Sequence, residues 1–93
     1  MKSTIISGSF NSTGKFDRLG KEFYLCYFGK QPDVSLNALA KVLGVGGIRK
    51  WAMKIERLMM LGMLPSVIRK GQYRVIPETI SFWFEMESDR RLL

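Results

Sequence analysis

A glycine-rich break between two segments of helical periodicity constrains this chain more than any other feature. The break is residues 44–47 (Gly-Val-Gly-Gly), and three glycines in four positions indicate a sharp turn, because glycine adopts positive φ and allows close backbone approach. Before the break, apolar residues repeat at helical spacing from Leu36 to Leu43, and Ser35 suits a helix N-cap. We therefore expect two short helices joined by a tight turn.

The segment after the glycines, residues 48–62, has the clearest amphipathic pattern in the chain. Its apolar residues recur at spacings of three and four, which predicts one buried helix face: Ile48, Trp51, Ala52, Ile55, Leu58, Met59 and Gly62. Trp51 lies on that stripe, so we expect it in the core. Gly62 is well placed to end the helix as a left-handed cap. The remaining positions are mainly basic, with Met53 among them: Arg49, Lys50, Lys54 and Arg57.

A longer helix is predicted upstream, over residues 15–28. Four apolar residues share one of its faces at helical spacing: Phe16, Leu19, Phe23 and Tyr27. Leu25, Cys26 and Phe28 widen this face, as expected of a helix that has neighbours on more than one side. Cys26 lies among aromatic residues and is expected to be a buried free thiol in a reducing compartment. Gly29 is a suitable stop for this helix.

After the third helix the pattern becomes strand-like. Residues 63–69 and 72–76 are the two candidate strands, and Lys70 and Gly71 supply the turn between them. Pro65 stands near the start of the first strand and suits an edge strand, because proline cannot donate a ladder hydrogen bond. The pattern predicts a small β-hairpin.

The last segment, residues 77–93, fits both a strand and a helix. Pro77 followed by the acidic Glu78 favours a helix start, since proline suits the first turn and acids complement the helix dipole. Its apolar side chains either pack on the first helix or form a surface for a homodimer: Ile80, Phe82, Trp83, Phe84 and Met86. The residues alone leave both alternatives open.

Length and composition indicate one small domain of the mainly α class with a β-hairpin. The chain has 93 residues, of which 15–77 form the predicted domain and 78–93 an added C-terminal segment. Residues 1–14 are expected to be a flexible arm with room for one short strand around Ile5 and Ile6. One cysteine and no histidine argue against an internal disulfide and a metal site. We see no export signal and no apolar run of membrane length, so we expect a cytoplasmic protein.

The charge of the chain is concentrated in its middle. The formal net charge is +7, and Glu56 is the only acid between Lys41 and Arg74, a segment with many lysines and arginines. From Pro77 onwards acids outnumber bases. This distribution indicates that the basic middle of the chain binds a polyanion. The alternative explanation is a basic surface that is merely solvated.

The chain resembles the winged helix-turn-helix family. Residues 35–45 (SLNALAKVLGV) are similar to the first half of its motif, residues 57–64 (RLMMLGML) to the end of its recognition helix, and residues 67–76 to its wing. The resemblance covers residues 16–77. Gly46 and Gly47 depart from the Ser, Thr or Pro that most relatives carry at the start of the recognition helix, which leaves the base-contacting register open by about one residue.

The resemblance implies duplex DNA binding, with helix 48–62 in the major groove and hairpin 67–76 as the wing. Near the helix start, Arg49 would address a guanine, and the neighbouring candidates are Lys50, Met53 and Lys54. Arg57 is better placed for a phosphate. Basic hairpin residues would reach the neighbouring DNA backbone or minor groove, or else serve solubility and protect the sheet edge: Arg69, Lys70 and Arg74. Lys41 would lie over a phosphate, or else complement a helix C-terminus.

The leading functional hypothesis is a DNA-binding transcriptional regulator that acts as a homodimer in the cytoplasm, at the nucleoid. The alternatives are a winged-helix interaction adaptor, such as a phage or plasmid accessory protein, and a non-specific architectural or replication protein. No nucleophile–base pair or phosphate-binding loop is present, so we do not expect an enzyme, a cofactor or a metal.

Overall fold

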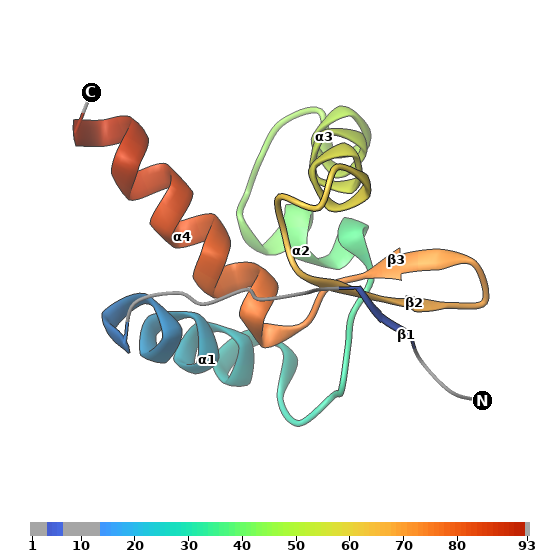
Figure 1. Cartoon of the computed structure of the whole chain (residues 1–93), viewed down its shortest axis with the longest axis horizontal. Helices are drawn as coiled ribbons and strands as arrows, with labels where there is room; N and C mark the ends of the chain where they lie inside the picture. The colour runs from blue at the N-terminus through green and yellow to red at the C-terminus, as the bar shows by residue number, and fades with distance from the viewer. Residues whose placement is uncertain (1–3, 7–13, 93) are drawn as a thin grey trace.

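Four helices and three short strands make up the part of the chain that the structure, a computed structural model, describes: residues 4–6 and 14–92, with side-chain surroundings for residues 14–89. Their order is β1 (Thr4–Ile6), α1 (Gly14–Phe28), α2 (Leu36–Val42), α3 (Ile48–Met60), β2 (Ser66–Arg69), β3 (Gln72–Arg74) and α4 (Pro77–Leu92) (Figure 1). The predicted class, mainly α with a small hairpin after the third helix, is confirmed. Of the predicted arm, β1 is the short strand, and residues 1–3 and 7–13 lie outside the described residues.

Helix α1 packs against α4 through its smallest residue. A Cβ on Gly20 would stand 2.1 Å from the Ser81 side-chain oxygen and 2.6 Å from the Ser81 backbone nitrogen, so only glycine fits at this crossing. Ser81 in turn lies 3.3 Å from the Asp17 carbonyl, to which its hydroxyl donates. The buried residues of α1 are therefore Gly20, Tyr24 and Phe28.

The predicted core face of α1 is only partly confirmed. Leu19 and Tyr27 are 41% and 57% exposed, and Leu25 and Cys26 are exposed as well, so Cys26 is not a buried thiol. Phe28 is buried in the core, and Phe23 packs on it, against Phe84 of α4 at a ring distance of 5.4 Å. The reason is the close crossing of α1 and α4 at Gly20. Because α4 approaches there, the face of α1 that is buried is the one with Gly20, Tyr24 and Phe28.

The break between α2 and α3 folds as the glycines predict. Ser35 caps α2, since its hydroxyl oxygen accepts from the Ala38 amide at 3.2 Å. Gly44 and Gly47 adopt left-handed conformations with φ of +67° and +70°, and Gly47 is the N-cap residue of α3. These two glycines set the direction in which α3 leaves the turn.

Helix α3 ends two residues earlier than the predicted 48–62. Gly62 follows with φ of +75°, and the Met63 amide donates to the Leu58 carbonyl at 2.8 Å, which closes the helix as a left-handed cap. Trp51, expected in the core, is partly buried and packs edge-to-face on Trp83 of α4 at 4.8 Å.

The hairpin strands are shorter than predicted, and a third strand joins them. Lys70 and Gly71 both have positive φ, 53° and 75°, which is the type I′ turn that suits a two-residue hairpin loop. Strand order is β1-β2-β3, so β2 is the central strand. The prediction of an edge strand at Pro65 is therefore wrong: this proline is buried and precedes β2, where no ladder donor is needed.

The core lies between the four helices and the hairpin. Its most deeply buried large apolar side chains come from α2, α3 and α4 and from the segments that follow α3 and β3: Leu39, Ile55, Met59, Leu64, Val75 and Ile80. The favoured helix over the C-terminal segment is confirmed, and Trp83 of this helix is also buried. Within residues 4–6 and 14–92, no helix is long and apolar enough to cross a membrane.

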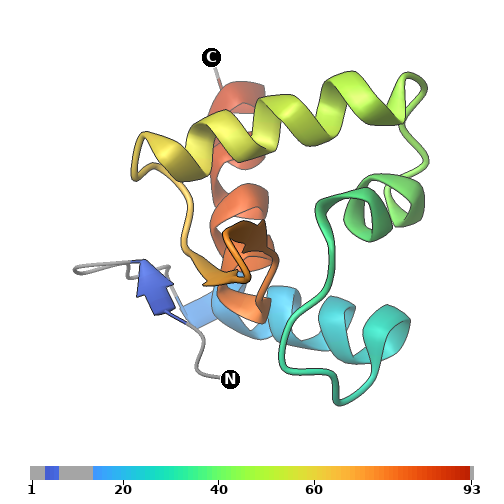
Figure 2. The same cartoon turned by 90° about the vertical axis from the view of Figure 1, so that its right-hand side faces the viewer.

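Figure 2 shows how the elements are placed around this core. Helix α3 crosses one side of the molecule and α1 the opposite side, while α4 runs behind them and connects the two. The hairpin projects toward the viewer between α1 and α3. Helix α3 and the hairpin therefore flank the same open face.

Candidate nucleic-acid interface

One face of α3 is buried and the other presents cations to solvent. Ala52, Ile55 and Met59 are buried, as the predicted stripe requires. The opposite face holds four exposed basic residues, Arg49, Lys50, Lys54 and Arg57. No ion pair joins any of these four to a carboxylate within residues 14–89. The structure thus places all four predicted cations of this helix on one accessible surface.

The first turn of α3 is electrostatically unfavourable in the free protein. Its N-cap, Gly47, offers no side-chain hydrogen bond, and the turn contains no acid. Arg49 and Lys50 instead place two positive charges at the end of the helix that already carries the positive pole of its dipole. An anion bound at this end would relieve the repulsion, which favours a negatively charged partner.

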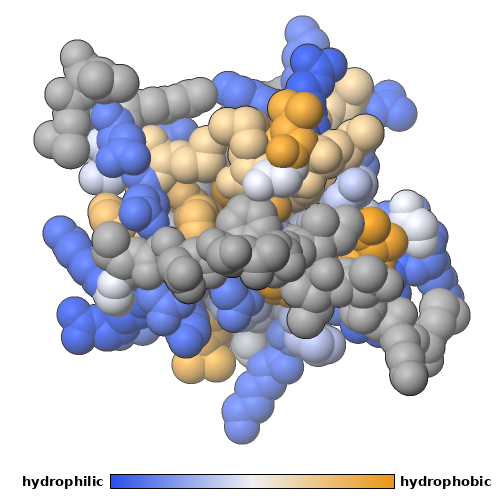
Figure 3. All heavy atoms as spheres, viewed as in Figure 1, coloured by the Kyte–Doolittle hydropathy of each residue, from blue (hydrophilic) through white to orange (hydrophobic). Residues whose placement is uncertain are grey.

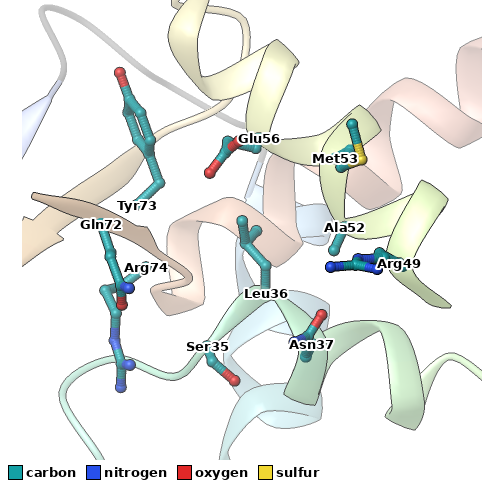
Figure 4. Close-up of a pocket in the computed structure, with 10 residues that line it drawn as sticks. All are labelled: Ser35, Leu36, Asn37, Arg49, Ala52, Met53, Glu56, Gln72, Tyr73 and Arg74. Carbon is teal, nitrogen blue, oxygen red and sulfur yellow. The ribbon is translucent and has the colours of Figure 1, made fainter.

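A groove of about 280 Å³ separates α3 from the hairpin, and α2 forms its floor (Figure 4). From α3 it is lined by Arg49, Met53 and Glu56, with Ala52 behind them. Asn37 of α2 lies next to Arg49 in the close-up, and Glu56 points into the groove. Polar side chains that were not candidate site residues line the groove from the start of α2 and from β3: Ser35, Asn37, Gln72 and Tyr73. Their proximity arises from tertiary packing, so no local spacing could have revealed it.

A second, larger hollow of about 580 Å³ runs along the outer face of α3. Lys50, Lys54 and Arg57 alternate there with thioether and aliphatic side chains. Met53 is 63% exposed, as predicted, and Met60 is 65% exposed. Figure 3 shows apolar side chains gathered over the upper part of the face seen in Figure 1, where α3 ends. The surface is therefore basic with apolar contacts interspersed.

Two of the three predicted hairpin cations are held by a buried carboxylate. Asp33 is 5% exposed, and its two oxygens accept from Arg69 Nη2 and Arg74 Nε, each at 2.7 Å. Burial opposes ionisation of Asp33, but the hydrogen bonds and charges of Arg74 and Arg69 outweigh it and keep the pKa of this carboxyl below its usual value. The side chains of Arg69 and Arg74 remain 35% and 29% exposed. Both arginines thus have a structural partner that sequence reasoning missed.

The Asp33 contacts tie the segment before α2 to the base of the hairpin. Val34 and Val75 exchange both backbone hydrogen bonds, at 2.9 and 2.7 Å, directly beside this cluster. Lys70 stands apart at the exposed hairpin tip, with no ion pair among residues 14–89. Lys41 is exposed in the last turn of α2, where its charge also suits the helix C-terminus.

The described elements follow the order helix, helix, turn, helix, hairpin, with an added C-terminal helix. Val34, between α1 and α2, is extended and pairs with Val75, which directly follows β3. No protein-family model, curated protein or solved structure matches this chain. The function must therefore be inferred from the arrangement of α3 and the hairpin around one face.

Proposed function

We propose that this chain is a winged helix-turn-helix domain that binds double-stranded DNA and regulates transcription. The observation that carries the proposal is the set of exposed cations on α3 that form no ion pair within residues 14–89, two of them at its N-terminus, beside a projecting hairpin. A B-form major groove is about 12 Å wide and admits one α-helix. Helix α3 is flanked by grooves rather than covered, so it is free to enter.

In this proposal the first half of α3 reads bases. Arg49 is exposed at the mouth of the hairpin-side groove, and its planar guanidinium matches the two acceptors of a guanine. Met53 lies one turn further on and would contact a thymine methyl. Lys50, Lys54 and Arg57 lie further around the same exposed face and would contact phosphates.

The hairpin contributes one phosphate contact and two structural arginines. Lys70 at the tip would meet the neighbouring backbone, whereas Arg69 and Arg74 chiefly hold the hairpin against Asp33. Lys41 on α2 stays a candidate phosphate contact. Four phosphate contacts from Lys50, Lys54, Arg57 and Lys70 correspond to a salt slope of about −3.6, at −0.9 for each phosphate.

Selection from random duplexes, followed by sequencing, tests the proposal directly. An enriched sequence supports a regulator, and R49A should then relax preference at one base position by about 1–3 kcal/mol. K70Q should weaken all sequences alike and reduce the salt slope by about 0.9. K21Q is the matched control, because Lys21 lies on α1 and pairs with Asp17 at 3.1 Å. Affinity that barely changes between 50 and 200 mM salt would rule out this mode of binding.

A protein-interaction adaptor is the second candidate, and one observation favours it. Met60, Leu61 and Met63 are exposed next to one another where α3 ends, and Leu61 is 66% exposed. Exposed apolar clusters often contact proteins. If no duplex is enriched, while M60E and L61E variants abolish binding to a partner protein, the adaptor function replaces DNA binding.

We also propose that the DNA-bound form is a two-fold dimer, as single domains of this kind seldom reach tight specific binding alone. Ile80 and Trp83 are buried in the chain's own core, which leaves Phe82, Phe84 and Met86 of the apolar tail as candidate dimer residues. Light scattering of the full chain with and without a selected duplex tests this. M86E should abolish the dimer, and circular dichroism checks the fold of the variant because Met86 packs partly on the core; an unchanged dimer would place the interface elsewhere.

A further inference from the structure

A hollow of about 380 Å³ lies between α3, α4 and the turn that joins α2 to α3. Trp51, Trp83 and Phe84 supply aromatic walls, and Leu43 and Val45 close the side toward the turn. The two indoles meet edge-to-face, with ring centroids 4.8 Å apart and planes at 75°. Trp51 and Phe84 are partly buried and Trp83 is 7% exposed, so the aromatic surface offered to a flat apolar group comes mainly from Trp51 and Phe84. We refer to this recess as the tryptophan hollow.

The rim of the tryptophan hollow carries one cation that no carboxylate neutralises. Lys54 lines it and forms no ion pair within residues 14–89. Glu87, also at the rim, has an interaction partner of its own. Lys54 is the lining side chain that can pair with an anion, so the hollow suits an anion attached to an apolar body.

We propose that the tryptophan hollow binds a small planar aromatic carboxylate. Its ring would lie against Trp51, Trp83 and Phe84, and its carboxylate would pair with Lys54. The volume suits a molecule of one or two rings, since ligand pockets generally start at about 300 Å³. Lys54 is also a proposed phosphate contact, so a bound carboxylate would compete with DNA. The competition rests on the proposed function, whereas ligand binding itself does not.

The two tryptophans allow a direct binding test, because the chain has only these two. We would titrate the ¹⁵N-labelled full chain with 2-naphthoate and follow both indole N–H signals. Both signals should shift and saturate, and the neutral isostere 2-naphthamide should bind about fivefold more weakly or worse. Absence of a saturable shift, or equal affinity for the amide, would overturn the proposal.

Two variants of α3 show whether binding of 2-naphthoate depends on Lys54 itself or only on the overall positive charge of the helix. K54Q should lower the affinity for 2-naphthoate about fivefold, and K50Q, which removes a cation on the same helix outside the tryptophan hollow, should leave it unchanged. Equal losses in the two variants would show that no specific site exists. Because K54Q removes only an exposed charge, its fold can be verified by the unshifted indole signals of the ligand-free form.

Competition with DNA is measured separately, by anisotropy of a selected duplex with and without saturating 2-naphthoate. The proposal predicts weaker DNA binding in the wild type and no effect of the ligand in K54Q. If the wild type binds the duplex equally well with and without 2-naphthoate, the ligand does not compete with DNA. If no duplex binds at all, the DNA-binding function fails, and the indole titration still decides whether the carboxylate site exists.

Discussion

At the scale of single residues, contacts over long sequence distances hold the framework on which α3 and the hairpin sit. Gly20 and Ser81 bring α1 and α4 together, and Asp33 gathers two arginines from both strands of the hairpin. Neither contact could be deduced from the sequence. Asp33 lies 36 and 41 residues from its partners, and a glycine contributes nothing to a hydrophobic pattern. Both contacts can be tested by small substitutions.

Replacing Gly20 with alanine should destabilise the protein by about 1–3 kcal/mol, because the added methyl group would overlap Ser81 backbone atoms and force α1 away from α4. Urea denaturation measures the effect. G14A is the matched control on the same helix: an added Cβ there meets nothing within 4 Å, and the free energy of unfolding should hardly change. Equal stability of G20A and the wild type would contradict the close crossing.

Replacing Asp33 with asparagine should lower the free energy of unfolding at neutral pH by about 1–3 kcal/mol, since two partly buried guanidinium groups lose their charged acceptor. The difference should depend on pH. The pKa of Asp33 is lower in the folded protein, so its ionisation stabilises the fold above the unfolded pKa of about 3.9. This contribution is lost as the pH falls through the folded pKa.

Denaturation of wild type and D33N between pH 2 and pH 7 checks this dependence. The two stability curves should converge in acid and separate as the pH rises. If D33N also bound duplex DNA with a steeper salt slope, the freed Arg69 and Arg74 would be acting as phosphate contacts. A constant difference in stability across the pH range would show that the charge of Asp33 is not what matters.

At the scale of elements, the sequence predicted the glycine turn, α3 and the hairpin well, and α1 poorly. In α3, Ile55 and Met59 mark the buried face, so the opposite face must be exposed. That face carries the basic residues, and the candidate site could therefore be predicted from the pattern of this single helix. In α1 the apolar residues surround the helix, and its true inner stripe begins at a glycine. Periodicity alone therefore could not determine which face packs on α4.

The start of α3 should show opposite effects on stability and on binding. K50E should stabilise the protein by about 0.3–1 kcal/mol, because an acid suits the first turn of a helix, and it should weaken DNA binding. R57E is the matched control in the last turn, where a basic residue is favourable. It should weaken both DNA binding and stability. Thermal denaturation and anisotropy measure the two quantities; loss of stability in K50E would contradict the dipole argument.

At the scale of the whole molecule, α4 is part of the single core rather than an appendage. Ile80 and Trp83 are buried among residues of α2, α3 and the hairpin. Thr79 also joins α4 to the turn after α3, because its hydroxyl donates to the Pro65 carbonyl. Helix α4 and the predicted domain over residues 15–77 therefore share one core.

A variant truncated after Ile76 should consequently fail to fold. Removal of α4 exposes the inner side of α1 and leaves Leu64 and Val75 without their neighbours. Circular dichroism and proton NMR should show lost helicity and collapsed chemical-shift dispersion. A folded truncated chain would mean that α4 is dispensable for the core.

The contact between α1 and α4 also has a consequence for folding during synthesis on the ribosome. The inner face of α1 stays uncovered until α4 has left the ribosome, so the domain cannot close before α4 is available. Contacts this distant in the chain slow folding relative to bundles of sequential neighbours. During that interval Tyr24 and Phe28 are exposed, and the nascent chain is a natural client for chaperones.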